Sequence, residues 1–250
     1  SKRIPRKNVR PFAGKPIIAY SIDAARSSGL FDDVIVSTDD DAIAAVARAY
    51  GARTPFVRPA ALSDDHTGTN TVVRHAIGWF REHGGLPEQV CCIYATAPFL
   101  QPRYLREGLD RLVASGKSFA FSVTSFAFPI QRALRIGADG CVEPIWPENV
   151  ARRSQDLEEA FHDAGQFYWG TARAFLDDVV LYSSASVPVM LPRHLVQDID
   201  TEEDWTRAEL MFGALRAAGR RMKVALRTDA SMRIGTARLM RCLTLADALR

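Results

Sequence analysis

Hydrophobic residues recur along this chain in two alternating patterns. Stretches with apolar positions three and four residues apart predict amphipathic helices, and the short β-branched or aromatic runs between them predict strands. The predicted helices cover residues 17–28, 42–51, 69–83, 103–114 and 201–218. The predicted strands cover residues 34–36, 56–57, 90–94, 119–123, 167–169 and 187–190. Strands that alternate with helices in this way favour βαβ units, so we expect an α/β fold with a mostly parallel sheet.

Residues that favour helix ends stand at several of the predicted boundaries. Gly29 and Gly84 follow the first and third helices and are expected to end them. Residues 39–41 are three aspartates before the second helix, where the helix dipole favours negative charge. Asp200 is the candidate N-cap of the last helix.

Three regions depart from this alternation. Residues 1–16 are basic, contain two prolines before Gly14 and are expected to form a loop. Residues 127–155 are aromatic, proline-rich and irregular, which indicates an excursion from the sheet. Residues 222–250 begin with a methionine and a new strand, followed by a loop and a helix. We therefore expect a first domain over residues 1–219 and the truncated start of a second over residues 222–250.

Composition narrows the class of protein. The chain has 250 residues, of which 47% are hydrophobic and 24% charged, and these values exclude a disordered or fibrous protein. The net charge of +3 is too small to indicate a nucleic-acid binder. No apolar run approaches the roughly 20 residues that span a bilayer. No signal peptide precedes the first motif, so we expect a cytoplasmic protein without membrane contact, whose four cysteines are reduced thiols.

The opening segment concentrates positive charge. Its basic residues are Lys2, Arg3, Arg6, Lys7 and Arg10. Cations and backbone N–H groups in such a loop would hold a nucleotide triphosphate. A solvated basic arm, or a patch that binds nucleic acid, would show the same composition. The run G-K-P that follows differs from the G-K-[ST] of a Walker loop.

An acidic pair stands near the other end of the predicted first domain. In an extended segment, residues two positions apart point to the same side, so Asp198 and Asp200 would both reach one metal ion while Ile199 turns into the core. Mg²⁺ is suited to one or two carboxylates together with phosphate and water. The alternative is that Asp200 and the following acidic residues only cap the helix.

A series of segments, in order, carries a family resemblance. They read SKRIPRKN, FAGKPIIAYSI, VIVSTDDDAIA, FVRPAALSDDHTGT, CCIYATAPF, RRSQDLEEAFHDAGQFYWG and LPRHLVQDIDTEEDW. They resemble the sugar-acid cytidylyltransferases, or CMP-sugar acid synthetases, and the likeness covers about residues 1–219. Within that family, IYATAPF and HDAGQFYWG are most similar to the members that act on pseudaminic acid.

The resemblance implies a fold and a reaction. The fold would be the Rossmann-like, three-layer nucleotidyltransferase type with a mostly parallel sheet. The reaction would be CTP plus pseudaminic acid to CMP-pseudaminic acid plus pyrophosphate, in the synthesis of nonulosonic acids for surface glycans or flagellin. It would use Mg²⁺ as cofactor, and the enzyme would be a homodimer. The family motif has a strand and ARGG before the serine matched by Ser1, and this sequence starts at that serine.

The resemblance also assigns residues on the nucleotide side. Lys7 would neutralise charge that develops on the phosphates, as expected where catalysis is mainly electrostatic. Asp198 and Asp200 would hold Mg²⁺, and with Lys7 they are the expected catalytic residues. The expected nucleotide-binding residues are Ser1, Lys2, Arg3, Asn8 and Arg58. This assignment predicts that Lys7 and Asp200 share one site.

The sugar acid would occupy the other half of the site. Arg153 would pair with its carboxylate through a bidentate contact. The other expected sugar-binding residues are Thr69, Asn70, Gln155, His162, Asp163 and Gln166. Thr69 and Asn70 could instead cap the helix that follows, and His162 and Asp163 could be structural hydrogen-bond partners. Residues 94–98 read YATAP where sialic acid relatives carry a run like QPTSP, which favours a differently substituted sugar.

Residues 222–250 resemble the start of the UDP-sugar hydrolase of the same pathway. That family has G-H where this chain has Ala237 and Arg238, which argues against hydrolase activity. A fusion of two pathway enzymes, cut short, is the simplest interpretation. In a second interpretation, Lys223–Asp229 supplies a strand to the first domain.

Other functions stay open at this point. The sugar would be N-acetylneuraminate or legionaminate in a related synthetase. The chain would bind CTP without catalysis if the residues before Ser1 are essential. A nucleic-acid binder based on the basic opening segment is a third alternative.

Overall fold

The fold is described from a computed structural model that covers residues 3–64 and 66–218. The chain divides into two compact units, residues 1–212 and residues 213–250. The predicted start of a second domain, residues 222–250, lies outside the described residues, and so do Ser1 and Lys2.

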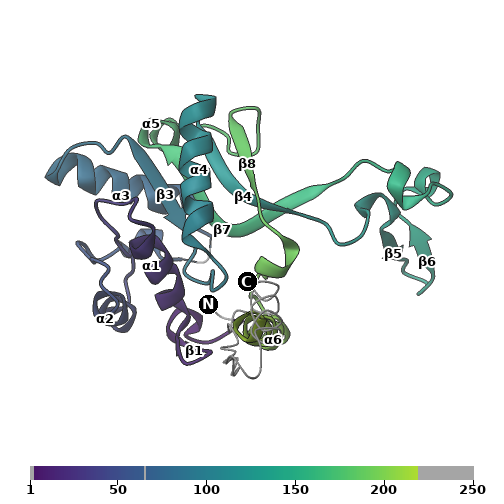
Figure 1. The fold of residues 1–250 in the computed structure, drawn as a ribbon, viewed down its shortest axis with the longest axis horizontal. Helices are drawn as coiled ribbons and strands as arrows, with labels where there is room; N and C mark the ends of the chain where they lie inside the picture. Colours follow the sequence, from purple (N-terminus) through teal and green to yellow (C-terminus); the bar gives the residue numbers. More distant parts are fainter. Residues whose placement is uncertain (1–2, 65, 219–250) are drawn as a thin grey trace, which may run out of the picture. The chain divides into compact units, whose positions relative to one another are not determined.

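Helices and strands alternate along the described chain (Figure 1). The helices are α1 (Ile17–Ser28), α2 (Asp41–Ala49), α3 (Thr69–His83), α4 (Pro102–Ser115), α5 (Ala172–Leu176) and α6 (Glu202–Ala218). The strands are β1 (Pro11–Phe12), β2 (Lys15–Pro16), β3 (Gln89–Ile93), β4 (Phe119–Ser125), β5 (Leu134–Ile136), β6 (Val142–Pro144), β7 (Phe161–Thr171) and β8 (Ser186–Met190). The five predicted helices are confirmed to within a few residues at their ends.

Three local predictions need correction. The opening segment is not all loop, because β1 and β2 pair as a short antiparallel hairpin. The strand predicted at residues 34–36 is reduced to one parallel bridge between Ile35 and Arg53. The strand predicted at residues 56–57 is wrong, since Phe56 instead packs against His75 and Trp79 of α3.

The main sheet is mixed rather than mostly parallel. Its strand order is β3-β7-β4-β8. β7 is antiparallel to both of its neighbours, and only β4 and β8 pair in parallel. Strands β3, β4 and β8 still run in one direction, as the alternation of strands and helices predicted. The exception is β7, which is preceded by an irregular segment and not by a crossover helix. Because an antiparallel strand can follow its neighbour without a crossover connection, β7 runs in the opposite direction.

Residues 126–160 form this irregular segment, here called the arm, between the end of β4 and the start of β7 (Figure 1). It contains the β5–β6 hairpin, in which Ile136 pairs with Val142, and three 3₁₀ turns. The turns are η3 (Ile130–Arg132), η4 (Pro147–Asn149) and η5 (Ser154–Asp156). The arm confirms the predicted excursion from the sheet.

Helix α4 covers one face of the sheet. The indole of Trp169 in β7 is buried there and donates to the Leu105 carbonyl at 2.9 Å. A Cβ atom at Gly108 would lie 2.7 Å from Trp169 and 2.8 Å from Phe167. Only glycine therefore allows this close approach of helix and strand.

Helices α3 and α5 cover the opposite face. Val73 and Ile77 of α3 pack with Phe119 of β4 and Phe175 of α5 in one buried cluster. The rings of Phe119 and Phe175 meet edge to face, with centroids 5.1 Å apart. The sheet thus lies between two helical layers, which confirms the predicted three-layer arrangement.

None of the helices in residues 3–64 and 66–218 combines the length and the apolar character that a membrane span requires.

Candidate active site

Most candidate residues gather at one edge of the sheet. The carboxyl ends of β3, β4 and β8 share this edge, and β7 starts there because it runs the other way. Tyr94 follows β3, Asp198 and Asp200 follow β8, and His162 and Asp163 lie at the start of β7. Ligands of open α/β sheets bind outside the carboxyl ends of the strands. The fold therefore brings distant segments together where a substrate would bind.

Lys7 and Asp200 are in contact. Lys7 lies in the 3₁₀ turn η1 (Lys7–Val9), and its Nζ donates to the Ile199 carbonyl at 2.5 Å and lies 3.4 Å from Asp200 Oδ1. The guanidinium of Arg3 pairs with Asp200 Oδ2 at 3.0 Å. Only 13% of the Lys7 side chain is exposed, against 67% for Arg3. Two cations of the opening segment thus flank one carboxylate from the other end of the domain.

The acidic pair has the alternating arrangement that the sequence predicts. Ile199 is fully buried, whereas Asp198 is exposed and Asp200 half-buried, as expected when residues two positions apart share a side. Partial burial raises the pKa of Asp198, and the nearby charge of Asp200 raises it further, against a smaller opposite effect of Lys7. A carboxylate whose charge is disfavoured by a neighbouring carboxylate is one that a bound cation would stabilise.

Thr201, not Asp200, caps helix α6. The Thr201 hydroxyl accepts from the backbone N–H of Asp204 at 3.2 Å, and Asp204 Oδ2 accepts in turn from the N–H of Thr201 at 2.8 Å. This reciprocal pair is a capping box, with aspartate at the position where glutamate is usual. Asp204 also accepts from the Asp200 N–H at 3.1 Å. The side chain of Asp200 is therefore not used as a cap and faces Lys7 and Arg3.

Arg10 fixes the opening segment on the first turn of α6. Its Nη1 lies 2.6 and 2.9 Å from the two carboxylate oxygens of Glu202, and its guanidinium carbon is 4.3 Å from the centre of the Trp205 ring. Phe12 packs edge to face on Trp205, with centroids 5.5 Å apart. These contacts hold the segment that carries Lys7 against the helix that follows Asp200.

A magnesium ion fits the chemistry of the acidic pair. Among the described residues, no group of three or more histidine, cysteine or acidic side chains is arranged to hold a metal. Asp198 and Asp200 are the two carboxylates that the protein would supply. Mg²⁺ commonly uses one or two carboxylates and takes its other oxygens from substrate phosphates and water. The site suits a metal that arrives with a nucleotide.

Arg58 lies beside the aspartates before α2. Its Nη2 is 3.4 Å from Asp39 Oδ1, and its Nε donates to the Ser63 hydroxyl at 3.0 Å. Asp40 caps α2 by accepting from the backbone N–H groups of Ala42 and Ile43, as the run of aspartates predicts. Arg58 is thus held close to the start of α2. Asn8, the other expected nucleotide contact, lies half-buried in η1.

Thr69 and Asn70 are not helix caps. The N-cap position of α3 is Gly68, which offers no side chain, and Thr69 is the first helical residue. The Thr69 hydroxyl instead lies 3.3 Å from the Tyr94 hydroxyl. Thr69 is exposed and Asn70 half-buried, so both remain available for a ligand at this edge.

Asp163 is fully engaged within the protein. Its Oδ2 accepts from the hydroxyls of Tyr168 at 2.6 Å and Tyr182 at 2.7 Å, and its Oδ1 accepts from the Gly165 N–H at 2.8 Å. His162 is exposed, and its ring packs on Phe126 at a centroid distance of 4.8 Å. Neither Tyr168 nor Tyr182 could be assigned to the site from the sequence, and Tyr94 was marked only as part of the YATAP run of residues 94–98.

Gln166 connects β7 to the segment that carries the acidic pair. Its Nε2 donates to the Leu195 carbonyl at 2.5 Å, three residues before Asp198. The side chain is 3% exposed, and its Oε1 has no hydrogen-bond partner among the described residues. Gln166 therefore lies behind the site surface, between the predicted sugar side and the predicted metal side.

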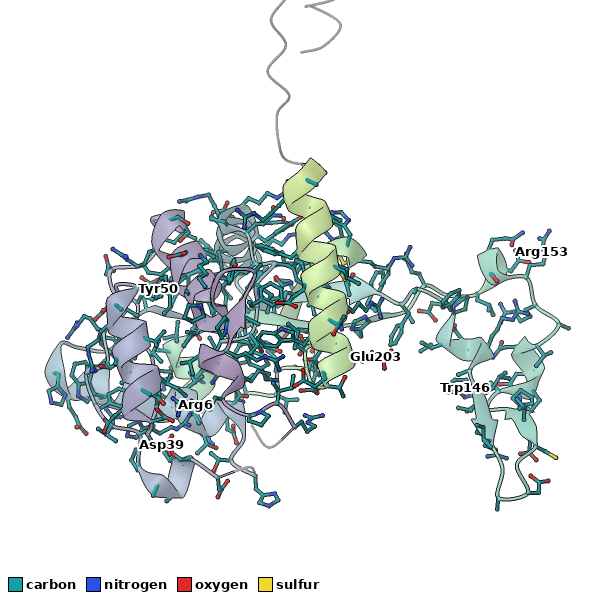
Figure 2. All side chains as sticks on the ribbon, turned by 90° about the horizontal axis from the view of Figure 1, so that it is seen from below. Arg6, Asp39, Tyr50, Trp146, Arg153 and Glu203 are labelled. Carbon is teal, nitrogen blue, oxygen red and sulfur yellow. The ribbon has the colours of Figure 1, made fainter. Side chains whose placement is uncertain are left out.

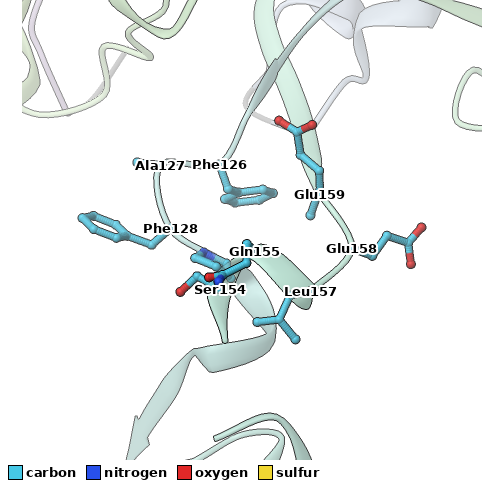
Figure 3. Close-up of a pocket in the computed structure, with 10 residues that line it drawn as sticks. Phe126, Ala127, Phe128, Ser154, Gln155, Leu157, Glu158 and Glu159 are labelled. Carbon is cyan, nitrogen blue, oxygen red and sulfur yellow. The ribbon is translucent and has the colours of Figure 1, made fainter. Parts of the chain in front are cut away.

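Arg153 and Gln155 lie on the arm. Within a single chain they are not close to the other candidate residues at the sheet edge. Figure 2 shows Arg153 and Trp146 on the arm, apart from Arg6 and Glu203. Arg153 forms a two-pronged ion pair with Asp156, at 2.8 and 3.2 Å. Gln155 helps to line an open pocket at the base of the arm (Figure 3). The pocket is lined by residues 126–129, 154–155 and 157–160.

The family model for cytidylyltransferases matches residues 1–168. The chain therefore belongs to the cytidylyltransferase family, whose members are CTP-dependent nucleotidyltransferases.

Two relatives of known name show which members of the family this chain is similar to. It is 42% identical over 212 residues to the pseudaminic acid cytidylyltransferase of Campylobacter jejuni, across 85% of this chain and 91% of that protein. It is 29% identical over 245 residues to a Helicobacter pylori protein named pseudaminic acid cytidylyltransferase and UDP-2,4-diacetamido-2,4,6-trideoxy-beta-L-altropyranose hydrolase, across 97% of this chain and 46% of that protein.

A solved structure confirms the type of fold. CMP:2-keto-3-deoxy-manno-octonic acid synthetase complexed with CTP matches with a TM-score of 0.60 at 14% identity, across 86% of this chain and 95% of that chain. The predicted Rossmann-like nucleotidyltransferase fold is therefore confirmed, with the mixed sheet described above.

Proposed function

We propose that this protein transfers CMP from CTP to pseudaminic acid and releases pyrophosphate. The observation that carries the proposal is the contact of Lys7 and Arg3 with Asp200, beside Asp198, at the carboxyl edge of the sheet in a chain of the cytidylyltransferase family. The named Campylobacter jejuni relative, with its 42% identity, supports pseudaminic acid as the sugar.

The reaction forms one phosphorus–oxygen bond and breaks another. The anomeric hydroxyl oxygen of the sugar acid attacks the α-phosphorus of CTP and loses its proton to solvent. The bond between the α-phosphorus and the bridging oxygen breaks, and pyrophosphate leaves with that electron pair. Lys7, held in place by the Ile199 carbonyl, supplies a fixed positive charge for the phosphate oxygens. Arg3 is more exposed and would turn from Asp200 to the triphosphate.

We propose that Asp198 and Asp200 hold Mg²⁺ together with the nucleotide. The bound ion would neutralise phosphate charge and polarise the α-phosphate. Asp204 and Gln166 keep the acidic segment in place, because they bond to Asp200 N–H and to the Leu195 carbonyl. The two carboxylates thus keep a fixed position from which to bind the ion.

On the sugar side, the residues near the start of β7 and α3 would bind the sugar acid. They are Thr69, Asn70 and His162, while the buried Gln166, which was expected to bind the sugar, supports the site from behind. Their supporting observation is their place at the same edge as Lys7 and Asp200. The reaction consumes CTP, a cytoplasmic metabolite, so we propose the cytoplasm as its location.

We also propose that two copies associate through the arm. Ile136 and Val142, a cross-strand pair of the hairpin, are 78% and 64% exposed. Further exposed apolar residues of the arm are Phe128, Leu134, Ile145, Trp146 and Val150. An apolar surface of this kind marks an interaction site, and a second copy is the partner that the resemblance implies. Arg153 and Gln155 would then lie near the interface.

A pyrophosphate-release assay tests the proposed reaction. The protein is incubated with CTP, MgCl₂ and one of three sugar acids: pseudaminate, legionaminate or N-acetylneuraminate. We expect release with pseudaminate to exceed the other two by at least tenfold. Asp200→Asn should abolish release while its circular dichroism stays like that of the wild type. Wild-type release by this variant would contradict the metal assignment, and equal rates with all three sugars would contradict the choice of substrate.

A further inference from the structure

Three aromatic hydroxyls and one carboxylate form a connected cluster behind the predicted sugar side. Tyr168 and Tyr182 both donate to Asp163 Oδ2, at 2.6 and 2.7 Å. The other oxygen of Asp163 accepts from Gly165, which has a φ of +62°. Because glycine adopts this backbone conformation without strain, the carboxylate can fold back on its own strand. No part of this arrangement is explained by the proposed metal and nucleotide contacts.

The protonation state of Tyr168 and Tyr182 is fixed. Burial raises the pKa of Tyr168 far above its usual range, and the hydrogen bond to Asp163 raises it further. The same two causes, in the same order, raise the pKa of Tyr182. Both hydroxyls therefore stay protonated donors at any working pH. The Asp163 carboxylate, with these donors and Gly165 in place, is a scaffold rather than a free ligand for the sugar.

Tyr94 is the half-buried member of the cluster that follows β3 at the carboxyl edge of the sheet, whereas Tyr182, 68% exposed, lies between α5 and β8. Its ring lies against Tyr168, with centroids 5.2 Å apart. Its backbone is fixed from two sides, since its N–H donates to the Gln166 carbonyl at 2.9 Å and its carbonyl accepts from the Ser21 hydroxyl at 2.7 Å. Its hydroxyl lies 3.3 Å from that of Thr69.

The Tyr94–Thr69 hydroxyl pair contributes little to folding. A hydrogen bond between two solvent-reachable hydroxyls replaces bonds that each would make to water, so its net contribution to stability is small. A phenylalanine would keep the ring contact with Tyr168. The hydroxyl of Tyr94 instead offers a donor and an acceptor at the sheet edge where substrates bind. Such paired hydroxyls match a ligand rich in hydroxyl and amide groups.

We propose that Tyr94, together with Thr69, is a specificity-determining contact for the polar substituents of the sugar acid, and that Asp163 is a positioning residue that acts through Tyr168 on Tyr94. This inference rests on the proposed function and deepens it, because it assigns the sugar-recognition point of that site. Asp163 itself then does not bind the sugar.

Steady-state kinetics, calorimetry and thermal unfolding of four variants test the inference. Steady-state kinetics give the KM for pseudaminate and for CTP, and calorimetry gives the affinity for pseudaminate in the absence of turnover. For Tyr94→Phe we expect a roughly tenfold higher KM for pseudaminate, as for one lost hydrogen bond. The KM for CTP and the melting temperature should stay unchanged. Tyr50→Phe, at the C-cap of α2 and outside the cluster, is the matched control and should leave every value unchanged.

The positioning role of Asp163 has its own readout. Asp163→Asn should raise the KM for pseudaminate without changing that for CTP. Because Asp163 acts through Tyr94, adding Asp163→Asn to Tyr94→Phe should cause no further loss of sugar affinity. A purely structural role would instead make the two effects add.

The outcomes separate this inference from the proposed function. A wild type that binds pseudaminate in a Tyr94-dependent way but makes no CMP-sugar would support the inference and contradict the reaction. Unchanged pseudaminate affinity in Tyr94→Phe would overturn the inference while leaving the reaction intact. Absence of pseudaminate binding by the wild type would overturn both.

Discussion

The charged side chain of Lys7 is largely buried, with 13% of its surface exposed. Two oxygen atoms of the protein lie beside its Nζ atom and compensate the charge. A buried cation is costly unless it is paired. The carbonyl of Ile199 and the carboxylate of Asp200 supply that pairing and at the same time fix the Nζ atom. At the residue scale, the site is therefore organised before any substrate binds, which is what electrostatic catalysis requires.

Replacing Lys7 by methionine tests this role. Lys7→Met keeps the length of the side chain but removes the charge, and we expect kcat to fall about 10²-fold, as for the loss of one preorganised charge partner. Lys15→Met is the matched control, because Lys15 pairs with Asp23 outside the site. Steady-state pyrophosphate release measures both. A kcat for Lys7→Met within twofold of the wild type would contradict the assignment.

At the scale of elements, the packing of α4 on β7 limits what the sheet tolerates. Gly108 is needed there because the rings of Phe167 and Trp169 occupy the space of a Cβ atom. Gly78 in α3 has open space around it. The same substitution at the two positions therefore separates helix propensity from packing.

Gly78→Ala should stabilise the fold by about 1 kcal/mol through helix propensity. Gly108→Ala should destabilise it by about 1–2 kcal/mol, since overpacking of the core outweighs that gain. Urea unfolding followed by circular dichroism measures both free energies. Stabilisation by both substitutions would show that α4 moves away from β7 at no cost.

The cap of α2 gives a pH-dependent prediction. Hydrogen bonds from Ile43 and Ala42 hold the pKa of Asp40 below its ordinary value of 3.8. A lowered folded-state pKa contributes stability that is present above the unfolded value and is lost as pH falls through the folded value. Asp40→Ala should therefore cost about 1 kcal/mol at pH 7, and this difference from the wild type should shrink below about pH 4. Thermal unfolding across pH checks this, and a difference that grows on acidification would contradict it.

At the scale of the whole molecule, the predicted site residues are divided between the arm and the carboxyl edge of the sheet. The arm carries Arg153 and Gln155, whereas the sheet edge carries Lys7, Asp198 and Asp200. The arm also presents the exposed apolar pair Ile136 and Val142. Association through this surface would give the arm a buried face that it lacks in a single copy.

The double variant Ile136→Lys with Val142→Lys should convert a dimer to a monomer without unfolding it. Charged residues at the core of an interface are strongly disfavoured. Val113→Lys is the matched control, since Val113 is equally exposed but lies on α4. Sedimentation equilibrium measures the mass of each protein. A double variant that remains dimeric would place the interface elsewhere.

The parts of the fold that follow from local signals could be predicted from the sequence. Gly29 ends α1 in the left-handed conformation that glycine favours, and Asp40 caps α2. The direction of β7 could not be predicted, because it depends on how the arm returns to the sheet. The cap of α6 was assigned one residue early, because Asp200 and Thr201 are both good caps and the choice depends on Asp204.

The candidate site shows the same division. The pairing of Lys7 with Asp200 followed from family motifs at both ends of the domain. The engagement of Asp163 did not, because its partner Tyr182 lies 19 residues further along, and no pattern in the sequence links the two residues. The distance of Arg153 from the sheet edge likewise depends on the path of the arm.

Calorimetric titration of CTP, with and without MgCl₂, is the sharpest test of a magnesium–nucleotide site at Asp198 and Asp200. We expect the wild type to bind CTP with Mg²⁺ at least tenfold more tightly than without it. This difference should disappear in Asp198→Asn and Asp200→Asn, both of which stay folded. If CTP binding by these two variants responds to Mg²⁺ as it does in the wild type, the two aspartates do not hold the ion.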